Sequence, residues 1–209
     1  LSIALFDDGA LVAASHAELG RGHAEALLPA IAALPDGGRC DRILVDLGPG
    51  SFTGVRVGVA AATSLGFGWS VPVEGYGCLD LVAAMARESL KPECDFAVVM
   101  VGGHGELFWA MAPARGDSPL QYAPLAIHST PIDVLATMID VPLLVGSGAQ
   151  ILLDAGAHGR AVPMLPDARE ALRLPLAQRQ RKPVPDYGRG ADAKPMAVVL
   201  RSQTPVEAR

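Results

Sequence analysis

The chain has 209 residues, of which half are hydrophobic and few are aromatic, and its formal net charge is -5. This length and composition exclude a disordered chain and allow one large domain or two small lobes. Lysine and arginine are not clustered in the first 150 residues, and direct binding to a phosphate backbone needs a clustered basic surface. Unaided nucleic-acid binding is therefore disfavoured.

Cysteine usage and hydropathy indicate the compartment. The three cysteines form no C-x-x-C pair, which disfavours a disulfide framework or structural zinc and fits a reducing cytoplasm. No apolar run reaches the roughly 20 residues that cross a bilayer. We therefore expect a cytoplasmic protein without a membrane segment. Because Ser2–Phe6 already reads as a strand in progress, we also expect a natural segment ahead of Leu1.

The first 90 residues alternate between extended and helical patterns. Asp7-Asp8-Gly9 is a hairpin-type turn between two strands, and Pro35-Asp36-Gly37-Gly38 ends a helical segment. A sharp glycine-containing loop at 48–51 separates a buried strand from the next helix. The expected elements are strands at 1–6, 10–18, 42–47 and 71–73 and helices at 23–34, 53–66 and 79–89.

A second pattern begins after Lys91-Pro92-Glu93. Proline and arginine are dense from Leu174 to Met196, which predicts a mobile, loop-like tail. The alternation predicts α/β architecture in two similar lobes, residues 1–92 and 93–209, the second carrying the tail. Its expected elements are strands at 96–101, 106–111 and 143–145 and helices at 131–139, 149–156 and 167–174.

The most informative stretch is Gly48–Gly58, GPGSFTGVRVG, which joins a strand to a helix. Ser51 or Thr53 can cap the helix, and a helix N-terminus can hold an anion. The Walker and dinucleotide fingerprints both fail here, because no lysine occurs before Lys91 and Thr53 replaces the last glycine. A structural strand-to-helix turn is favoured over a phosphate cradle, and Ser51 has no G-x-S-x-G elbow around it.

Two helices carry unusual surfaces. Gly54, Gly58, Ala62 and Gly66 are spaced by four and lie on one helical face. Such a smooth stripe either packs tightly inside one subunit or forms a helix contact between subunits, and the spacing leaves both open. In the helix at 23–34, two adjacent apolar stripes exceed the arc of an ordinary surface helix, which indicates a core position or a partner subunit.

These features resemble the TsaB family of tRNA threonylcarbamoyladenosine biosynthesis proteins. The likeness rests on Gly48–Gly58 and on Arg21–Pro29, RGHAEALLP, and is specific over residues 1–90. The family's opening strand, which ends in an Asp-Thr-Ser turn, is absent here, and Gly102-Gly103-His104 replaces its frequent Asp-Ala-Arg. Weaker matches are Gly105–Trp109, Gly146-Ser147-Gly148, Leu165–Ala168 and Asp192–Pro195.

The resemblance implies an actin-like ATPase (ASKHA) fold of two ribonuclease-H-like lobes. It implies a non-catalytic subunit that binds and supports TsaD in threonylcarbamoyl transfer to the adenosine beside the anticodon of tRNA. The ATPase TsaE joins the complex, tRNA is met only through it, and ATP and metal are expected on the partner subunits. No catalytic, cofactor or metal residue is expected in this chain. The expected interface residues are His23, Glu25, Leu27, Leu28, Ile31, Thr53, Gly54, Arg56, Val57, Gly58, Ala61 and Ala62.

Alone, the chain is expected to form a homodimer through residues 23–34 and 53–66, because soluble monomers rarely expose such an apolar patch. The rival function is an actin-like-fold enzyme, either a glycoprotease-like metallopeptidase or a kinase. No histidine has another histidine four positions away, and H-E-x-x-H is absent. Asp7 and Asp8 read more simply as turn residues than as magnesium ligands.

Overall fold

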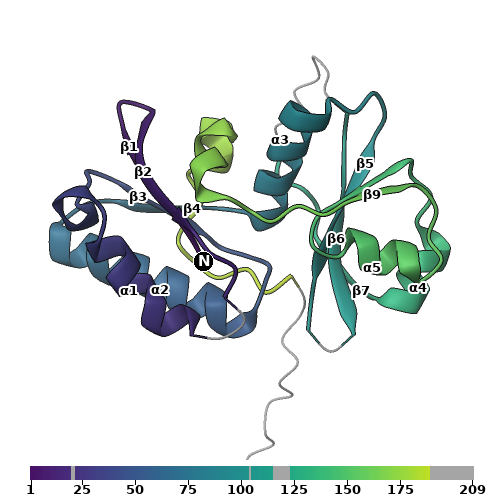
Figure 1. The fold of residues 1–209 in the computed structure, drawn as a ribbon, viewed down its shortest axis with the longest axis horizontal. Helices are drawn as coiled ribbons and strands as arrows, with labels where there is room; N and C mark the ends of the chain where they lie inside the picture. Colours follow the sequence, from purple (N-terminus) through teal and green to yellow (C-terminus); the bar gives the residue numbers. More distant parts are fainter. Residues whose placement is uncertain (20–21, 104, 115–122, 189–209) are drawn as a thin grey trace, which may run out of the picture.

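The computed structural model describes residues 1–19, 22–103, 105–114 and 123–188, without the side chain of His23. It is a mixed α/β protein whose elements gather in two groups (Figure 1). The N-terminal group contains β1 to β4 with α1 and α2, and the C-terminal group contains β5 to β9 with α3 to α5. The first group is built from two small sheets and the second from one larger sheet.

The N-terminal strands form two separate pairs. Strands β1 (Ser2–Asp7) and β2 (Ala10–His16) make an antiparallel hairpin, turned by Asp8 and Gly9 at positive φ. Strands β3 (Ile43–Asp46) and β4 (Val73–Tyr76) pair in parallel. In the described chain, no pairing joins β1 to β3.

Helices α1 (His23–Ala32) and α2 (Phe52–Trp69) lie side by side along one flank of the N-terminal group (Figure 1). Helix α2 begins at the Ser51 cap, whose hydroxyl accepts from the Gly54 amide at 3.4 Å, and ends at Ser70 in the left-handed region. Gly66 allows its close approach to β4, because a Cβ there would lie 2.2 Å from Val73 Cγ2. The helix therefore packs on the chain's own β3–β4 pair.

The C-terminal sheet has the order β7-β6-β5-β8-β9 and is covered on both faces. Along β5 the side chains alternate, as a strand requires: Val98 packs in a core with α3, whereas Val99 packs in a core with α4 and α5. Figure 1 shows α3 on the side toward the N-terminal group and α4 and α5 on the far side. The elements are β5 (Phe96–Val101), β6 (Glu106–Ala112), β7 (His128–Pro131), β8 (Leu143–Val145), β9 (Arg160–Val162), α3 (Cys78–Leu90), α4 (Ile132–Met138) and α5 (Ala149–Asp154).

Helix α3 connects the two groups. Its apolar face packs on the C-terminal sheet, although the predicted boundary at residue 92 assigns it to the N-terminal lobe. The 3-10 helix η3 (Ala168–Arg173) packs against α3 and against β1. After a second 3-10 turn, η4 (Leu176–Gln178), Arg181 pairs with Gly75 of β4. Segments distant in sequence therefore fasten the N-terminal strands to the rest of the molecule.

The seven elements expected in the first 90 residues are all present, with bounds shifted by a few residues. Strands β7 and β9, which are 4 and 3 residues long, were not predicted, since strands this short carry little periodic signal. The segment expected as a helix at 167–174 is the 3-10 helix η3. The predicted mobile tail lies partly outside the described residues, beyond position 188.

Candidate partner-binding face and the cavity behind it

The outward face of α1 and α2 exposes large apolar side chains. Leu28 on α1 is 54% exposed, and on α2 Phe52 is 54% and Phe67 is 90% exposed. The chain has five phenylalanines, and these two, both on α2, are the exposed ones. A folded chain normally exposes such side chains singly, and a group of them along one flank marks a surface for interaction.

An arginine and two aromatic rings form a cluster at the start of this face. Arg56 Cζ lies 3.5 Å from the centroid of the Phe52 ring, and Arg56 Nε donates to the Tyr187 hydroxyl at 2.9 Å. The Phe52 and Tyr187 rings lie 5.2 Å apart. Arginine and tyrosine are enriched at the residues that dominate binding energy in interfaces. Tyr187 was missed by sequence analysis because only the fold brings it to α2.

The predicted interface residues fall into two sets. Four of them, Glu25, Leu28, Thr53 and Arg56, are exposed on the outward face. The backbone of His23 begins α1. The others line a cavity between the helices and the strands: Leu27, Ile31, Gly54, Val57, Gly58, Ala61 and Ala62.

The cavity has a volume of about 1350 Å³ and lies within the N-terminal group. Its walls are β1, β3, α1, α2 and η3. The aliphatic side chains of β1 and β3 that reach it, including Ile3, Leu5 and Val45, are only half-buried. By contrast, the buried core clusters of the described chain contain no residue of β1 or α1.

The small-residue stripe of α2 faces this interior. A Cβ on Gly58 would meet Val45 Cγ2 of β3 at 4.0 Å, an ordinary contact distance. A Cβ on Gly66 would clash with Val73 of β4. Ala62 is buried. Of the two alternatives that the spacing left open, packing inside the subunit is the one that these contacts support.

The glycine loop after β3 is packed rather than open. A Cβ on Gly48, whose φ is 93°, would lie 2.6 Å from the Asp186 carbonyl oxygen. The Asp186 amide donates to the Leu47 carbonyl at 2.7 Å, so the segment around Asp186 lies over the loop. This covering supports the structural interpretation of the loop over a phosphate cradle.

A group of ionisable side chains lies beneath this loop. Asp46 Oδ1 accepts from the Gly48 amide at 2.8 Å, and its carboxyl also bonds to the Cys78 thiol. Burial raises the pKa of Asp46 to about 6, against the opposing effects of these bonds and of Arg181, while Asp80 raises it further. Burial also holds the pKa of Cys78 well above its usual value, so the thiol stays protonated.

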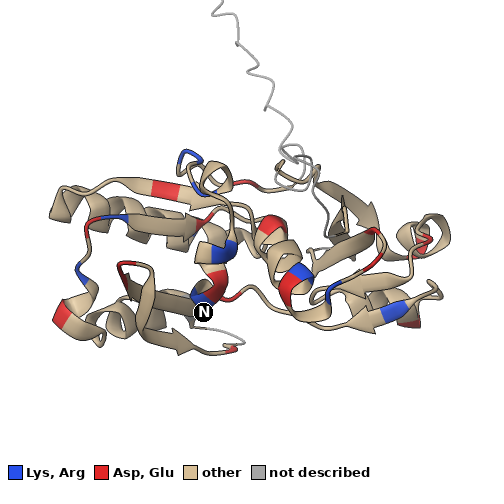
Figure 2. Ribbon diagram, turned by 90° about the horizontal axis from the view of Figure 1, so that it is seen from above, with Lys and Arg blue, Asp and Glu red and all other residues tan. Residues whose placement is uncertain are grey.

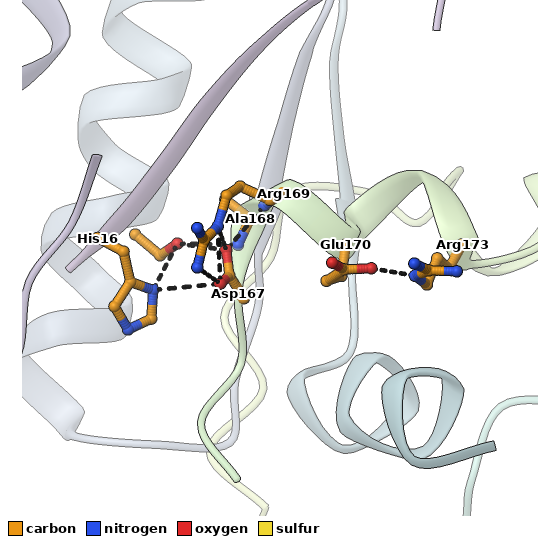
Figure 3. A network of polar contacts seen from close by, with 7 residues as sticks. His16, Asp167, Ala168, Arg169, Glu170 and Arg173 are labelled. Carbon is orange, nitrogen blue, oxygen red and sulfur yellow. Dashed lines mark hydrogen bonds and ion pairs between the residues drawn. The ribbon is translucent and has the colours of Figure 1, made fainter. Parts of the chain in front are cut away.

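A Ser-His-Asp constellation links the hairpin to η3. His16 Nδ1 lies 3.2 Å from Ser2 Oγ and 3.6 Å from Asp167 Oδ2. Figure 3 shows His16 facing Asp167 with Arg169 folded onto the same carboxylate, and Glu170 paired with Arg173 further along. The bonds to Arg169 hold the pKa of Asp167 below its usual value.

This constellation fastens elements together and is not arranged for hydrolysis. A hydrolytic triad uses the two ring nitrogens separately, one toward the serine and one toward the acid. Here the same Nδ1 faces both, and Ser2 Oγ also accepts from the Ala168 amide at 2.9 Å while lying 3.3 Å from Asp167 Oδ1. The network therefore joins β1, β2 and η3 at one end of the cavity.

The structure also places the residues considered from sequence as possible metal ligands or nucleophiles. Asp7 and Asp8 are exposed at the hairpin turn, and Ser51 serves as the cap of α2. Among the residues that the structure describes, no three His, Cys, Asp or Glu side chains form a group that could hold a metal ion. Lys and Arg are interspersed with Asp and Glu along the ribbon (Figure 2). Within the described ranges, no helix has the length and apolarity to span a membrane.

Comparison with known proteins identifies the family. Residues 14–118, about half of the chain, match the model of TsaD, tRNA N6-adenosine threonylcarbamoyltransferase. An uncharacterized protein of Mycobacterium tuberculosis (strain ATCC 25618 / H37Rv) is 27% identical over 191 residues, covering 85% of this chain and 80% of that protein. The tRNA threonylcarbamoyladenosine biosynthesis protein TsaB of Bacillus subtilis (strain 168) is 33% identical over 94 residues, covering 42% of this chain and 40% of TsaB.

Solved structures agree with this fold. YeaZ from Pseudomonas aeruginosa superimposes with a TM-score of 0.64 at 24% identity, covering 83% of this chain and 84% of YeaZ. A Pseudomonas aeruginosa protein described as similar to peptidase YEAZ gives a TM-score of 0.65 at 24% identity, covering 83% of each chain.

The chain belongs to the TsaD family, and its fold is the α/β fold of that actin-like, ribonuclease-H-like group. Within the family it is a TsaB/YeaZ-like protein, which confirms the resemblance drawn from Gly48–Gly58 and Arg21–Pro29.

Proposed function

We propose that this protein is a non-catalytic subunit that binds TsaD and supports threonylcarbamoyl transfer to tRNA in the cytoplasm. The proposed pathway rests on the likeness to TsaB. The proposed role as a subunit rests on one structural observation, which is that Leu28, Phe52 and Phe67 are exposed along the flank of α1 and α2. An exposed apolar flank suits a subunit that is covered by a partner. TsaE joins as the ATPase, and tRNA meets the chain only through the complex.

The proposed interface is the outward face of the two helices. It takes Glu25, Leu28, Thr53 and Arg56 from the set expected by sequence, together with the exposed Phe52 and Phe67. The cavity-lining members of that set, such as Leu27 and Gly58, position the helices from behind. In this arrangement the two halves of the molecule are the two ribonuclease-H-like lobes of an actin-like fold, and the helices of the first lobe meet the partner.

Without TsaD, the same face is expected to meet a second copy of the chain. We therefore expect a homodimer through residues 23–34 and 53–66. Light scattering at high micromolar concentration should give twice the monomer mass, and Leu28→Asp should shift the protein toward monomer. A wild-type protein that stays monomeric at that concentration would contradict this expectation.

Reconstitution tests the function. TsaD, TsaE, ATP, threonylcarbamoyl donor and tRNA are incubated with and without the purified chain, and modified adenosine is measured by mass spectrometry. We expect modification to depend on the chain, whereas the chain alone neither modifies tRNA nor hydrolyses ATP or peptides. The kinase or peptidase alternative would instead give turnover by the chain alone, lost on substitution of Asp7, Ser51 or His23. Full modification in its absence would refute the proposed role.

A further inference from the structure

The exposed guanidinium of Arg56 is held in one orientation by the chain's own residues. Its Cζ lies 3.5 Å from the centroid of the Phe52 ring and 5.2 Å from that of the Tyr187 ring, within the range over which an aromatic face attracts a cation. Its Nε donates a hydrogen bond to the Tyr187 hydroxyl at 2.9 Å. Two rings and one hydrogen bond therefore restrict a side chain that is otherwise among the most flexible at a protein surface.

Tyr187 is itself held in place, because both of its neighbours in sequence are packed. The Asp186 amide donates to the Leu47 carbonyl at 2.7 Å, and the Gly188 amide donates to Asp186 Oδ1 at 3.0 Å. A Cβ on Gly188, whose φ is 66°, would lie 2.8 Å from Pro49 Cβ. The end of β3 and the loop after it therefore fix the backbone on each side of the tyrosine, and its hydroxyl is a fixed acceptor.

The far end of the Arg56 guanidinium carries donors that the described chain does not use. Arginine holds further N–H groups on Nη1 and Nη2 in a planar fork. Among the described residues, the contacts of Arg56 are the Nε bond and the two rings, and no carboxylate pairs with it. Other arginines of the same part of the chain do form ion pairs with Asp or Glu: Arg42, Arg169, Arg173 and Arg181.

We propose that Arg56, positioned by Phe52 and Tyr187, is an anchor for an Asp or Glu carboxylate on TsaD. This inference rests on the proposed function, because Arg56 and Phe52 lie on the outward face of α1 and α2. With Nε engaged by Tyr187, the Nη1 and Nη2 groups offer two parallel donors, which match the two oxygens of a carboxylate. Because the side chain is already ordered, less rotamer entropy is lost on binding. Tyr187 is therefore a positioning residue that acts on affinity through Arg56.

The same fork also matches a phosphate, but the surface around it does not suit a nucleic-acid backbone. Binding to such a backbone needs a cluster of basic side chains. Along the described ribbon, Lys and Arg are interspersed with Asp and Glu (Figure 2). A single ordered arginine beside exposed aromatic rings fits a protein interface, where arginine and tyrosine are enriched.

The test measures the affinity of TsaD for single variants by calorimetry. Arg56→Lys keeps the charge but removes the fork, and it should weaken binding by about tenfold or more. Tyr187→Phe keeps a ring against Phe52 but removes the acceptor, and it should weaken binding by about threefold to tenfold. In the matched control, Val184→Ala changes a residue of the same segment that is 64% exposed, and affinity should equal that of wild type. Melting temperatures should stay close to wild type, because each change lies at the surface.

A double-mutant cycle separates positioning from a merely structural role. If Tyr187 acts through Arg56, Tyr187→Phe should cause no further loss of affinity once Arg56 is replaced by alanine. The same cycle against single neutralising variants of the acidic residues of TsaD should couple Arg56 to one carboxylate. Additive losses from the two positions, or coupling to no carboxylate, would overturn the anchor. A loss of tRNA binding by the complex at unchanged affinity for TsaD would also overturn it.

The result for Leu28→Asp distinguishes this inference from the proposed function. If Leu28→Asp weakens TsaD binding while Arg56→Lys and Tyr187→Phe do not, the face stands and the carboxylate anchor is wrong. If Leu28→Asp binds TsaD as tightly as wild type, the proposed face itself is wrong.

Discussion

The two halves of this protein bury their apolar side chains to different extents. In the C-terminal half, one five-stranded sheet is covered on both faces, and Leu107, Val98 and Val99 are fully buried. In the N-terminal half, two separate pairs surround a cavity, and residues of β1 and β3 are only half-buried. Stability therefore resides in the C-terminal sheet, while the N-terminal half carries the exposed apolar flank of α1 and α2 and the cavity behind it.

Matched leucine truncations should show the largest difference between the halves. Leu107→Ala opens a new cavity in a closed core and should lower the free energy of unfolding by about 3–5 kcal/mol. Leu27→Ala enlarges a cavity that already exists and should lower it by about 1 kcal/mol. Urea unfolding of both variants checks this. Equal losses of unfolding free energy would contradict the proposed difference between the halves.

The carboxyl of Asp46, at the end of β3, should make the free energy of unfolding depend on pH. Its folded pKa, about 6, lies above the ordinary 3.8, so its stabilising contribution is complete below pH 3.8 and is lost as pH rises through 6. The raised pKa corresponds to roughly 1–3 kcal/mol. Asp46→Asn, which can still accept from the Gly48 amide, should gain stability over wild type by that amount at pH 7.5.

At pH 3.5 most of the advantage of Asp46→Asn should disappear, because wild-type Asp46 is then protonated in the folded state and mostly protonated in the unfolded state. Denaturant melts of the two proteins at both pH values give the difference directly, since the other titrating groups, including Asp80, Cys78 and Arg181, are common to both. A variant that is less stable than wild type at pH 7.5 would contradict the raised pKa.

The network at Asp167 should show the opposite pH dependence. Arg169 lowers the pKa of Asp167, so its contribution is present above the unfolded value and is lost as pH falls through the folded pKa. Asp167→Ala should lower stability by about 1 kcal/mol at pH 7 and by less at pH 3. Thermal melts at both pH values check this, and a loss that grows on acidification would exclude the ion pair as its cause.

The smallest effect is expected at Gly58. Gly58→Leu places a side chain in the cavity and removes a helix-interior glycine, which should raise stability by about 1 kcal/mol. Because the position faces β3, affinity for TsaD should stay within about twofold. The spacing alone also allowed an interface position, for which a loss of about 5- to 150-fold follows from overpacking. Measuring melting and affinity on one variant separates the two.

Local patterns in the sequence predicted the N-terminal elements and the family, because their periodicity and the GPGSFTG loop depend on neighbouring residues. They could not show which face of α2 meets solvent, because Gly54 and Gly58 allow the close approach of either a sheet of the same subunit or a helix of a partner. Nor could they bring Tyr187 to Arg56 or Asp167 to His16, which are joined only by long-range packing. The packing of α3 on the C-terminal sheet likewise depends on contacts distant in sequence.

The central claim is that the outward face of α1 and α2 binds TsaD. The most direct measurement is the affinity of TsaD for Leu28→Asp compared with Leu176→Asp, whose leucines are 54% and 53% exposed but lie on α1 and on η4. Burying an unpaired carboxylate at an interface should weaken binding by about tenfold to a hundredfold or more, so Leu28→Asp should lose affinity while Leu176→Asp matches wild type. Equal affinity of all three proteins for TsaD would contradict the account.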